Sequence, residues 1–221
     1  MRRRGGSGRL AVIFVVVGLV ATACGSSGTD EAQPACEPSL TAGIEQRTID
    51  HEGTTREYQV AVPDGTPRGI IFDFHGAGGT IADQDEVTRL STAGPRRGFV
   101  VVTPQGLGNP ARWTVPGLPG PDDVALVEAI DAQVRAEACV EGPTIATGIS
   151  AGASMTVQLA CTSDLVSIIA PVAGISLYRR CPTGPPVATI TYHGTDDQFV
   201  PYVGPDGWEE TEQQPDAYVI G

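Results

Sequence analysis

The run from Pro143 to Cys161 constrains the fold more than any other part of the chain. Its residues 148–152 read Gly-Ile-Ser-Ala-Gly, between two apolar segments. They fit Gly-x-Ser-x-Gly, in which a strand, a sharp turn carrying Ser150 and a helix follow one another. A serine lifted out of a sheet needs a strained backbone, and its glycine neighbours let strand and helix pass closely. Such a short pattern also arises as a plain glycine-rich turn, so its weight depends on context.

Short apolar runs alternate with helical segments along the rest of the chain. Runs typical of strands lie at residues 57–62, 70–74, 99–103, 143–146, 167–172 and 187–192. Asp122 is a good N-cap for a helix with a shared apolar face, made by Leu126, Val127, Ile130 and Val134. This alternation predicts an α/β fold with a mostly parallel, doubly wound sheet, right-handed crossovers and helices on both faces. No internal repeat or metal-ligand spacing is found, and we expect no metal or other cofactor.

The N-terminus has the layout of an export signal. Four arginines precede an unbroken apolar run from Leu10 to Val20, and Ala21-Thr22-Ala23 fits a cleavage site. A membrane span needs about 20 apolar residues, and this run is shorter. We therefore expect a signal peptide over residues 1–23, a tether over 24–43 and one domain over 44–221.

The cysteine count favours lipid attachment at Cys24 over simple cleavage. Five cysteines leave one over, and removing Cys24 leaves an even set in an oxidising compartment, comprising Cys36, Cys139, Cys161 and Cys181. These four allow three disulfide connectivities, and the sequence does not choose among them. The chain is thus expected outside the cell or on the cell envelope, with a possible lipid anchor.

The charge of the chain excludes some partners. Four of the 14 basic residues and none of the 26 acidic residues lie in residues 1–23, which leaves a net charge of −16 without that segment. A surface this acidic argues against nucleic acid and against electrostatic docking to anionic lipid. Solubility outside the cell is the simpler explanation of the charge.

Three loops with chemistry-bearing residues follow predicted strands, and ligands gather at the carboxyl ends of parallel strands. The first loop, His75-Gly76-Ala77-Gly78-Gly79, resembles a loop that offers backbone N–H groups to an oxyanion. We assign the donors to Ala77, or Gly76 next to it, together with Ala151. For the His75 side chain we expect a scaffolding role.

The last loop runs from His193 to Tyr202 and contains two adjacent aspartates, Asp196 and Asp197. An acid at this place would orient a catalytic histidine beside Ser150. The alternative is an aspartate pair that only forms the turn or binds a calcium-like ion.

In these segments the chain resembles the secreted polyhydroxybutyrate depolymerase and feruloyl esterase-like family of α/β-hydrolases. The resemblance spans about Arg56 to Tyr202 and rests on the order and spacing of short blocks at residues 56–58, 62–65, 75–79, 98–101, 113, 122–124, 148–152, 170–174, 193–197 and 200–202.

The resemblance implies an α/β-hydrolase fold and an esterase that forms an acyl-enzyme on Ser150. It implies ester substrates: polyhydroxyalkanoates, feruloyl or acetyl groups on polysaccharide, or small acyl esters. The family pattern His-Gly-Thr-x-Asp makes Asp197 the acid. Trp113 resembles a family tryptophan near the substrate cleft, and a packing role is equally compatible. Asp122-Asp123 corresponds to a helix start.

A base for Ser150 is the missing part. In the family a histidine follows the acid, yet the sequence has three histidines and none lies after Asp197. His51 precedes the predicted strands, while His75 and His193 belong to the two loops. We expect a C-terminally truncated esterase that lacks the last strand and helix and is impaired. The alternatives are a non-catalytic lipoprotein with an acyl-binding cleft, or a His193 that turns toward Ser150.

Overall fold

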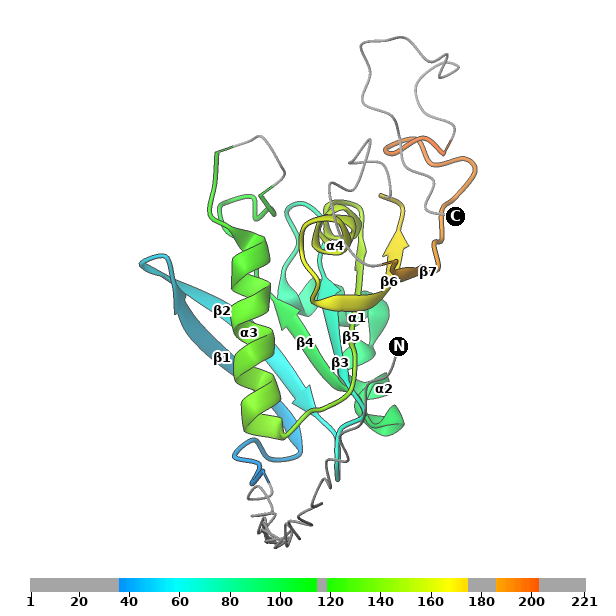
Figure 1. The fold of residues 1–221 in the computed structure, drawn as a ribbon. Helices are drawn as coiled ribbons and strands as arrows, with labels where there is room; N and C mark the ends of the chain where they lie inside the picture. The colour runs from blue at the N-terminus through cyan, green and yellow to red at the C-terminus, as the bar shows by residue number, and fades with distance from the viewer. Residues whose placement is uncertain (1–35, 115–118, 175–185, 203–221) are drawn as a thin grey trace, which may run out of the picture. The chain divides into compact units, whose positions relative to one another are not determined.

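A mostly parallel sheet organises the part of the chain that the computed structural model describes, which comprises residues 36–114, 119–174 and 186–202 (Figure 1). Within these residues the sheet has seven strands in the order β1-β2-β4-β3-β5-β6-β7. β1 and β2 form an antiparallel hairpin, β2 is antiparallel to β4, and the other neighbours are parallel. The bounds are β1 Gly43–His51, β2 Thr54–Val62, β3 Ile70–Phe74, β4 Val100–Pro104, β5 Thr144–Ile149, β6 Val166–Val172 and β7 Ala188–Thr189.

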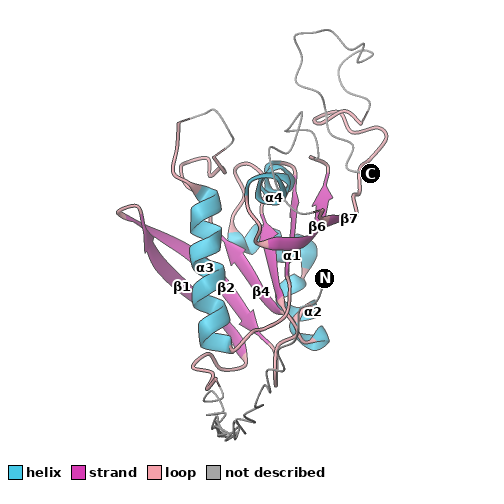
Figure 2. Cartoon of the chain, viewed as in Figure 1, coloured by secondary structure: helices cyan, strands magenta, loops and turns pink. Residues whose placement is uncertain are grey.

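Helices cover both faces of this sheet. α3 and α4 lie on one face, and α1 and α2 lie on the other (Figures 1 and 2). The α-helices are α1 Ile81–Thr88, α2 Leu90–Ala93, α3 Asp123–Ala138 and α4 Ala151–Thr162, and a 3₁₀ helix, η1, spans Pro95–Arg97. The predicted α/β fold, with a mostly parallel sheet between two helical layers, is therefore confirmed.

Helix α3 forms as its sequence predicts. The side chain of Asp122 accepts a hydrogen bond from the backbone N–H of Ala125 at 2.9 Å and so caps the helix. The four residues of the predicted apolar face are fully buried against the sheet, namely Leu126, Val127, Ile130 and Val134. Because α3 connects β4 to β5, it begins at the carboxyl edge of the sheet and ends at the opposite edge.

Several elements of the described residues differ from the sequence prediction: α2 and η1 have no counterpart in it, and β1, α1 and β7 differ for the reasons that follow. β1 was not predicted, because its alternating residues are mostly polar and exposed; His51 therefore ends a strand and does not precede the sheet. α1 was missed for a similar reason, since only Ile81 and Gln84 of its eight residues are buried. β7 is shorter than the predicted run 187–192, although Tyr192 makes a further parallel bridge with Val172.

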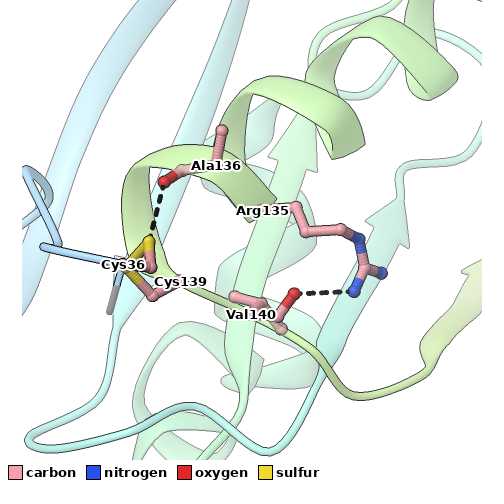
Figure 3. Close-up of a disulfide and its surroundings, with 5 residues drawn as sticks. All are labelled: Cys36, Arg135, Ala136, Cys139 and Val140. Carbon is pink, nitrogen blue, oxygen red and sulfur yellow. Dashed lines mark hydrogen bonds between the residues drawn. A yellow bond between two sulfur atoms is a disulfide. The ribbon is translucent and has the colours of Figure 1, made fainter. Parts of the chain in front are cut away.

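The segment before β1 is fastened to the end of α3. Cys36 forms a disulfide with Cys139, which identifies one pair of the predicted set (Figure 3). The N–H groups of Ser39 and Leu40 both donate to the carbonyl of Glu137, and Leu40 is buried. From residue 36 on, the predicted tether is thus held against the domain.

The remaining predictions for the N-terminal region and the cysteines lie largely outside the described residues. Cys161 is also disulfide-bonded. The predicted signal peptide over 1–23, Cys24 and Cys181 fall in ranges that the structure does not describe. Within the described ranges, no helix combines the length and apolar character needed to cross a membrane.

Candidate active site

Ser150 stands at the turn between β5 and α4. Its backbone has φ 55° and ψ −117°, a region that residues with a side chain rarely adopt. The Ser150 N–H donates to the carbonyl of Val172 at 2.9 Å, which ties the turn to the end of β6. The strained backbone expected from Gly-x-Ser-x-Gly is therefore present, and strain of this kind persists where the surrounding structure enforces it.

The two glycines of the pattern are required by close backbone contacts. A Cβ added to Gly152 would lie 2.1 Å from the carbonyl oxygen of Phe74, and one added to Gly148 would lie 2.6 Å from backbone atoms of Gly152. Neither position has room for a side chain. α4 can therefore start directly above the end of β3, and this brings Ser150 next to the loop that follows β3.

The loop His75–Gly79, which we call the oxyanion loop, borders Ser150. A Cβ added to Gly76 would lie 3.6 Å from the Cβ of Ser150. The N–H of Gly78 donates to Ala111 and that of Gly79 donates to Gly76. By contrast, the N–H groups of Gly76 and Ala77 have no acceptor among the described residues, nor does that of Ala151 in the first turn of α4. These three are the donors that the sequence singled out.

The His75 side chain is fully committed to holding this loop. One ring nitrogen, Nε2, accepts from the Gly106 N–H at 2.9 Å, so the proton resides on Nδ1, which donates to the Gly76 carbonyl at 2.7 Å. Burial lowers the pKa of His75, which favours the neutral ring. This geometry matches the scaffolding role expected from the sequence and leaves His75 no free nitrogen for Ser150.

Trp113 is buried beneath the oxyanion loop. Its indole N–H donates to the carbonyl of His75 at 2.8 Å, and its ring meets Phe74 edge-on with centroids 5.3 Å apart. Only 4% of Trp113 is exposed. This placement suits the packing alternative, while direct contact with a substrate stays a prediction.

The segment His193–Tyr202, which we call the acid loop, begins at the same edge of the sheet. Val172 pairs with Ile149 on one side and with Tyr192 on the other, so the ends of β5 and β6 and the start of the acid loop lie at one level. Asp197 Oδ1 accepts from the N–H groups of Phe199 and Val200, both at 2.9 Å. These bonds, led by the one from Val200, lower the pKa of Asp197 and keep it ionised.

The histidines near this edge are engaged elsewhere. His193 Nε2 lies 3.5 Å from Asp197 but only 2.6 Å from the carbonyl oxygen of Val200, to which it donates. His51 Nε2 lies 3.1 Å from the carbonyl of Asp122. In the described part of the chain, no histidine contacts the Ser150 hydroxyl, and no cluster of three metal-ligating side chains is found.

Similarity to known proteins agrees with this geometry. No protein-family model matches the chain. It is 30% identical over 184 residues to "Feruloyl esterase C" of Emericella nidulans and 29% identical over 187 residues to "Probable feruloyl esterase C" of Aspergillus niger. A solved cold-adapted esterase from an Arctic intertidal metagenomic library superposes with a TM-score of 0.57 at 16% identity, covering 74% of this chain and 77% of the other. The chain has an α/β-hydrolase fold and is similar to feruloyl esterases. Each feruloyl esterase alignment covers 77% of this chain and 64% of the relative.

Sequence reasoning missed two residues that support this α/β-hydrolase site. Gln105 follows β4 and its side-chain amide contacts both ends of the oxyanion loop. Arg56 is buried and pairs with Asp123 at 2.8 Å, while Asp123 also accepts from the Thr114 N–H at 2.7 Å. The sequence carried no local signal for either role: Arg56 precedes the predicted strand 57–62 and its acidic partner lies 67 residues away, while Gln105 contacts His75 across 30 residues.

Proposed function

We propose that this chain carries the nucleophile of an exported serine hydrolase that cleaves carboxylic esters through an acyl-enzyme on Ser150. One observation carries the proposal: a strained serine at the carboxyl edge of the sheet lies beside a loop in which two N–H groups have no acceptor among the described residues. Acyl transfer needs these two parts together, because the attacked carbonyl oxygen becomes negatively charged beside the nucleophile.

In the proposed reaction the Ser150 oxygen attacks the ester carbonyl carbon. The carbonyl oxygen takes up negative charge and accepts hydrogen bonds from Ala77 or Gly76 and from Ala151. The ester C–O bond then breaks, the alcohol leaves with a proton, and water later releases the acid from Ser150. A serine hydroxyl is a poor nucleophile without a base. Since the described histidines bind elsewhere, we propose slow turnover, because an enzyme lacking a triad member retains about 10³–10⁴-fold catalysis over water.

The proposed substrates are feruloyl, acetyl or polyhydroxyalkanoate esters. The names of the relatives support the feruloyl class. The export signal expected at the N-terminus and the disulfide Cys36–Cys139 support a location outside the cytoplasm, where disulfides persist. Lipid attachment at Cys24 is part of this proposal.

A fluorophosphonate probe tests the nucleophile directly. Attack by Ser150 on phosphorus would expel fluoride and leave a stable covalent label, so the chain should be labelled once and Ser150→Ala should not. Ser154→Ala is the matched control, since Ser154 lies one turn further along α4 and should leave labelling unchanged. Labelling that survives in Ser150→Ala, or a folded chain that is never labelled, would contradict the proposal.

The second candidate is a binding lipoprotein without chemistry. It is favoured by the engagement of all three histidines with backbone groups. A folded chain that binds ethyl ferulate without hydrolysing it, and resists the probe, would support this candidate.

A further inference from the structure

The N–H groups of Gly76 and Ala77, which have no acceptor among the described residues, belong to peptide units whose carbonyls accept hydrogen bonds from buried side chains. The Trp113 indole holds the carbonyl of His75 at 2.8 Å. The His75 ring holds the carbonyl of Gly76 at 2.7 Å. Each of these carbonyls shares a peptide unit with the N–H of the following residue, which is Gly76 in the first case and Ala77 in the second.

Because of peptide geometry, these two carbonyl hydrogen bonds also set the direction of the N–H groups. A peptide unit is planar and trans, so its C=O and N–H point in opposite directions. A side chain that holds the carbonyl on the buried side therefore directs the N–H toward the opposite side. Trp113 thereby aims the N–H of Gly76, and His75 aims that of Ala77. Gly76 is also the residue that borders Ser150.

Gln105 helps to fix the tautomer of the His75 ring, which is the part of this arrangement that could change. Its Oε1 accepts from the Ile81 N–H at 3.0 Å, just beyond the loop, and its Nε2 lies 3.2 Å from both the Gly79 carbonyl and His75 Nε2. The Gln105 amide and the Gly106 N–H are thus both hydrogen-bond donors at Nε2 of the His75 ring. These donors keep the His75 proton on Nδ1, where it must be to hold Gly76.

The segments that carry Gln105 and Trp113 are themselves anchored. The buried Arg56 guanidinium binds Asp123 at 2.8 Å and the Gln105 carbonyl at 3.3 Å. Asp123 in turn holds the N–H of Thr114, next to Trp113. The hydrogen bonds that hold the oxyanion loop are thus connected through Arg56 and Asp123 to the start of α3 and do not depend on the loop alone.

We propose that Trp113 and Gln105 are positioning residues for the reaction of Ser150: Trp113 aims the Gly76 N–H, and Gln105 keeps His75 in the tautomer that aims the Ala77 N–H. This inference rests on the proposed esterase function and deepens it. It assigns Trp113 a role beneath the oxyanion loop, acting through backbone groups that touch the substrate oxygen.

Trp113→Phe tests the first half, because it keeps an aromatic ring and removes only the N–H donor and one ring of the indole. We expect the maximal rate of fluorophosphonate labelling to fall at least about tenfold, with the probe's half-saturation concentration within twofold of the parent, because removing one oxyanion donor outright costs 10²–10³-fold. Tyr58→Phe is the matched control, since its hydroxyl is buried and has no hydrogen-bond partner among the described residues, and it should label at the parental rate.

Gln105→Glu tests the second half through pH. A carboxylate still accepts from Ile81, but it cannot donate, and it draws the His75 proton to Nε2. Labelling should be slowed about tenfold at pH 8, and the difference in labelling rate from the parent should narrow toward pH 4, near the ordinary pKa of a glutamate side chain, where the introduced carboxyl regains a proton to donate. A purely structural defect would slow labelling equally at both pH values.

Amide NMR separates this inference from the proposed function. Parental labelling rates in Trp113→Phe, or losses that only track the unfolded fraction measured by circular dichroism, would overturn the inference. If the parent is never labelled but Trp113→Phe shifts the Gly76 and Ala77 amide signals, the esterase function fails and the aiming of these groups stands. If the parent is never labelled and those signals stay in place, both fail.

Discussion

The oxyanion loop and the acid loop both follow strands at the carboxyl edge of the sheet, yet they are held in different ways. The oxyanion loop is fastened by residues far along the chain: Gly106 and Trp113 bind His75 from 31 and 38 residues away. In the acid loop the hydrogen bonds of His193 and Asp197 to other described residues stay within residues 193–200. One side of the site is thus built into the core, and the other folds upon itself.

Exposure follows the same division. His75 and Trp113 are buried, whereas Phe199 is 97% exposed and Tyr202 is 60% exposed. The acid loop also follows β7, a two-residue strand at the edge of the sheet. Regions with few buried contacts open locally at low free-energy cost. The oxyanion loop is therefore preorganised, while the acid loop depends on local hydrogen bonds.

The largest difference in stability between the two loops should appear when a methyl group is added to a glycine beside each of them. Gly152→Ala forces a Cβ to within 2.1 Å of the Phe74 carbonyl, whereas the nearest atom to a Cβ at Gly194 lies 4.0 Å away. Helix propensity alone would favour alanine at Gly152 by about 1 kcal/mol. We expect the clash to dominate and Gly152→Ala to lose about 3 kcal/mol or more, with Gly194→Ala close to the parent. Urea denaturation measures the unfolding free energy of both variants. Equal stabilities would contradict the difference in packing between the two loops.

A smaller effect is expected at Asp73, on the buried side. Burial raises the pKa of Asp73 to about 6, against the hydrogen bonds from Thr88 and Gln84. A raised carboxyl pKa means that stability is fully present below the ordinary value of 3.8 and is lost as pH rises through 6. Asp73→Asn should therefore be more stable than the parent at pH 7.5, by about 1–3 kcal/mol, and match it near pH 4. A parent whose stability does not change between pH 4 and 7 would refute this.

Asp197, in the exposed acid loop, should affect the pH dependence of stability in the opposite direction from Asp73. Backbone N–H groups lower its pKa, so its contribution is present above the ordinary value and is lost as pH falls through the folded one. Asp197→Asn should lower the melting temperature slightly at pH 7, by less than Asp73 substitution changes it, and the difference should vanish in acid. A change as large as that at Asp73 would mean that the acid loop is part of the core.

The smallest effect is expected at Phe199. A side chain that is almost wholly exposed has little burial to lose, so Phe199→Ser should stay within about 0.5 kcal/mol of the parent in urea denaturation. A clear loss would show that this ring is covered in solution. The matched substitution on the buried side, Phe74→Ser, should cost several kcal/mol.

The same division explains what could be predicted from the sequence. The Ser150 turn and α3 were predictable, because glycine spacing, an N-cap and an apolar face are local signals. β1 was not, because its strand is polar on both faces. The roles of Gln105 and Arg56 were hidden for another reason: their partners lie tens of residues away, and no local pattern marks a buried amide or guanidinium.

The link between Cys36 and Cys139 has a mechanical consequence. It joins the chain to the far end of α3, at the edge of the sheet away from Ser150. A pull applied upstream of Cys36 would enter the domain through a covalent bond into a long packed helix, without peeling β1 off the sheet. Force would then bypass the strained serine and the loops around it.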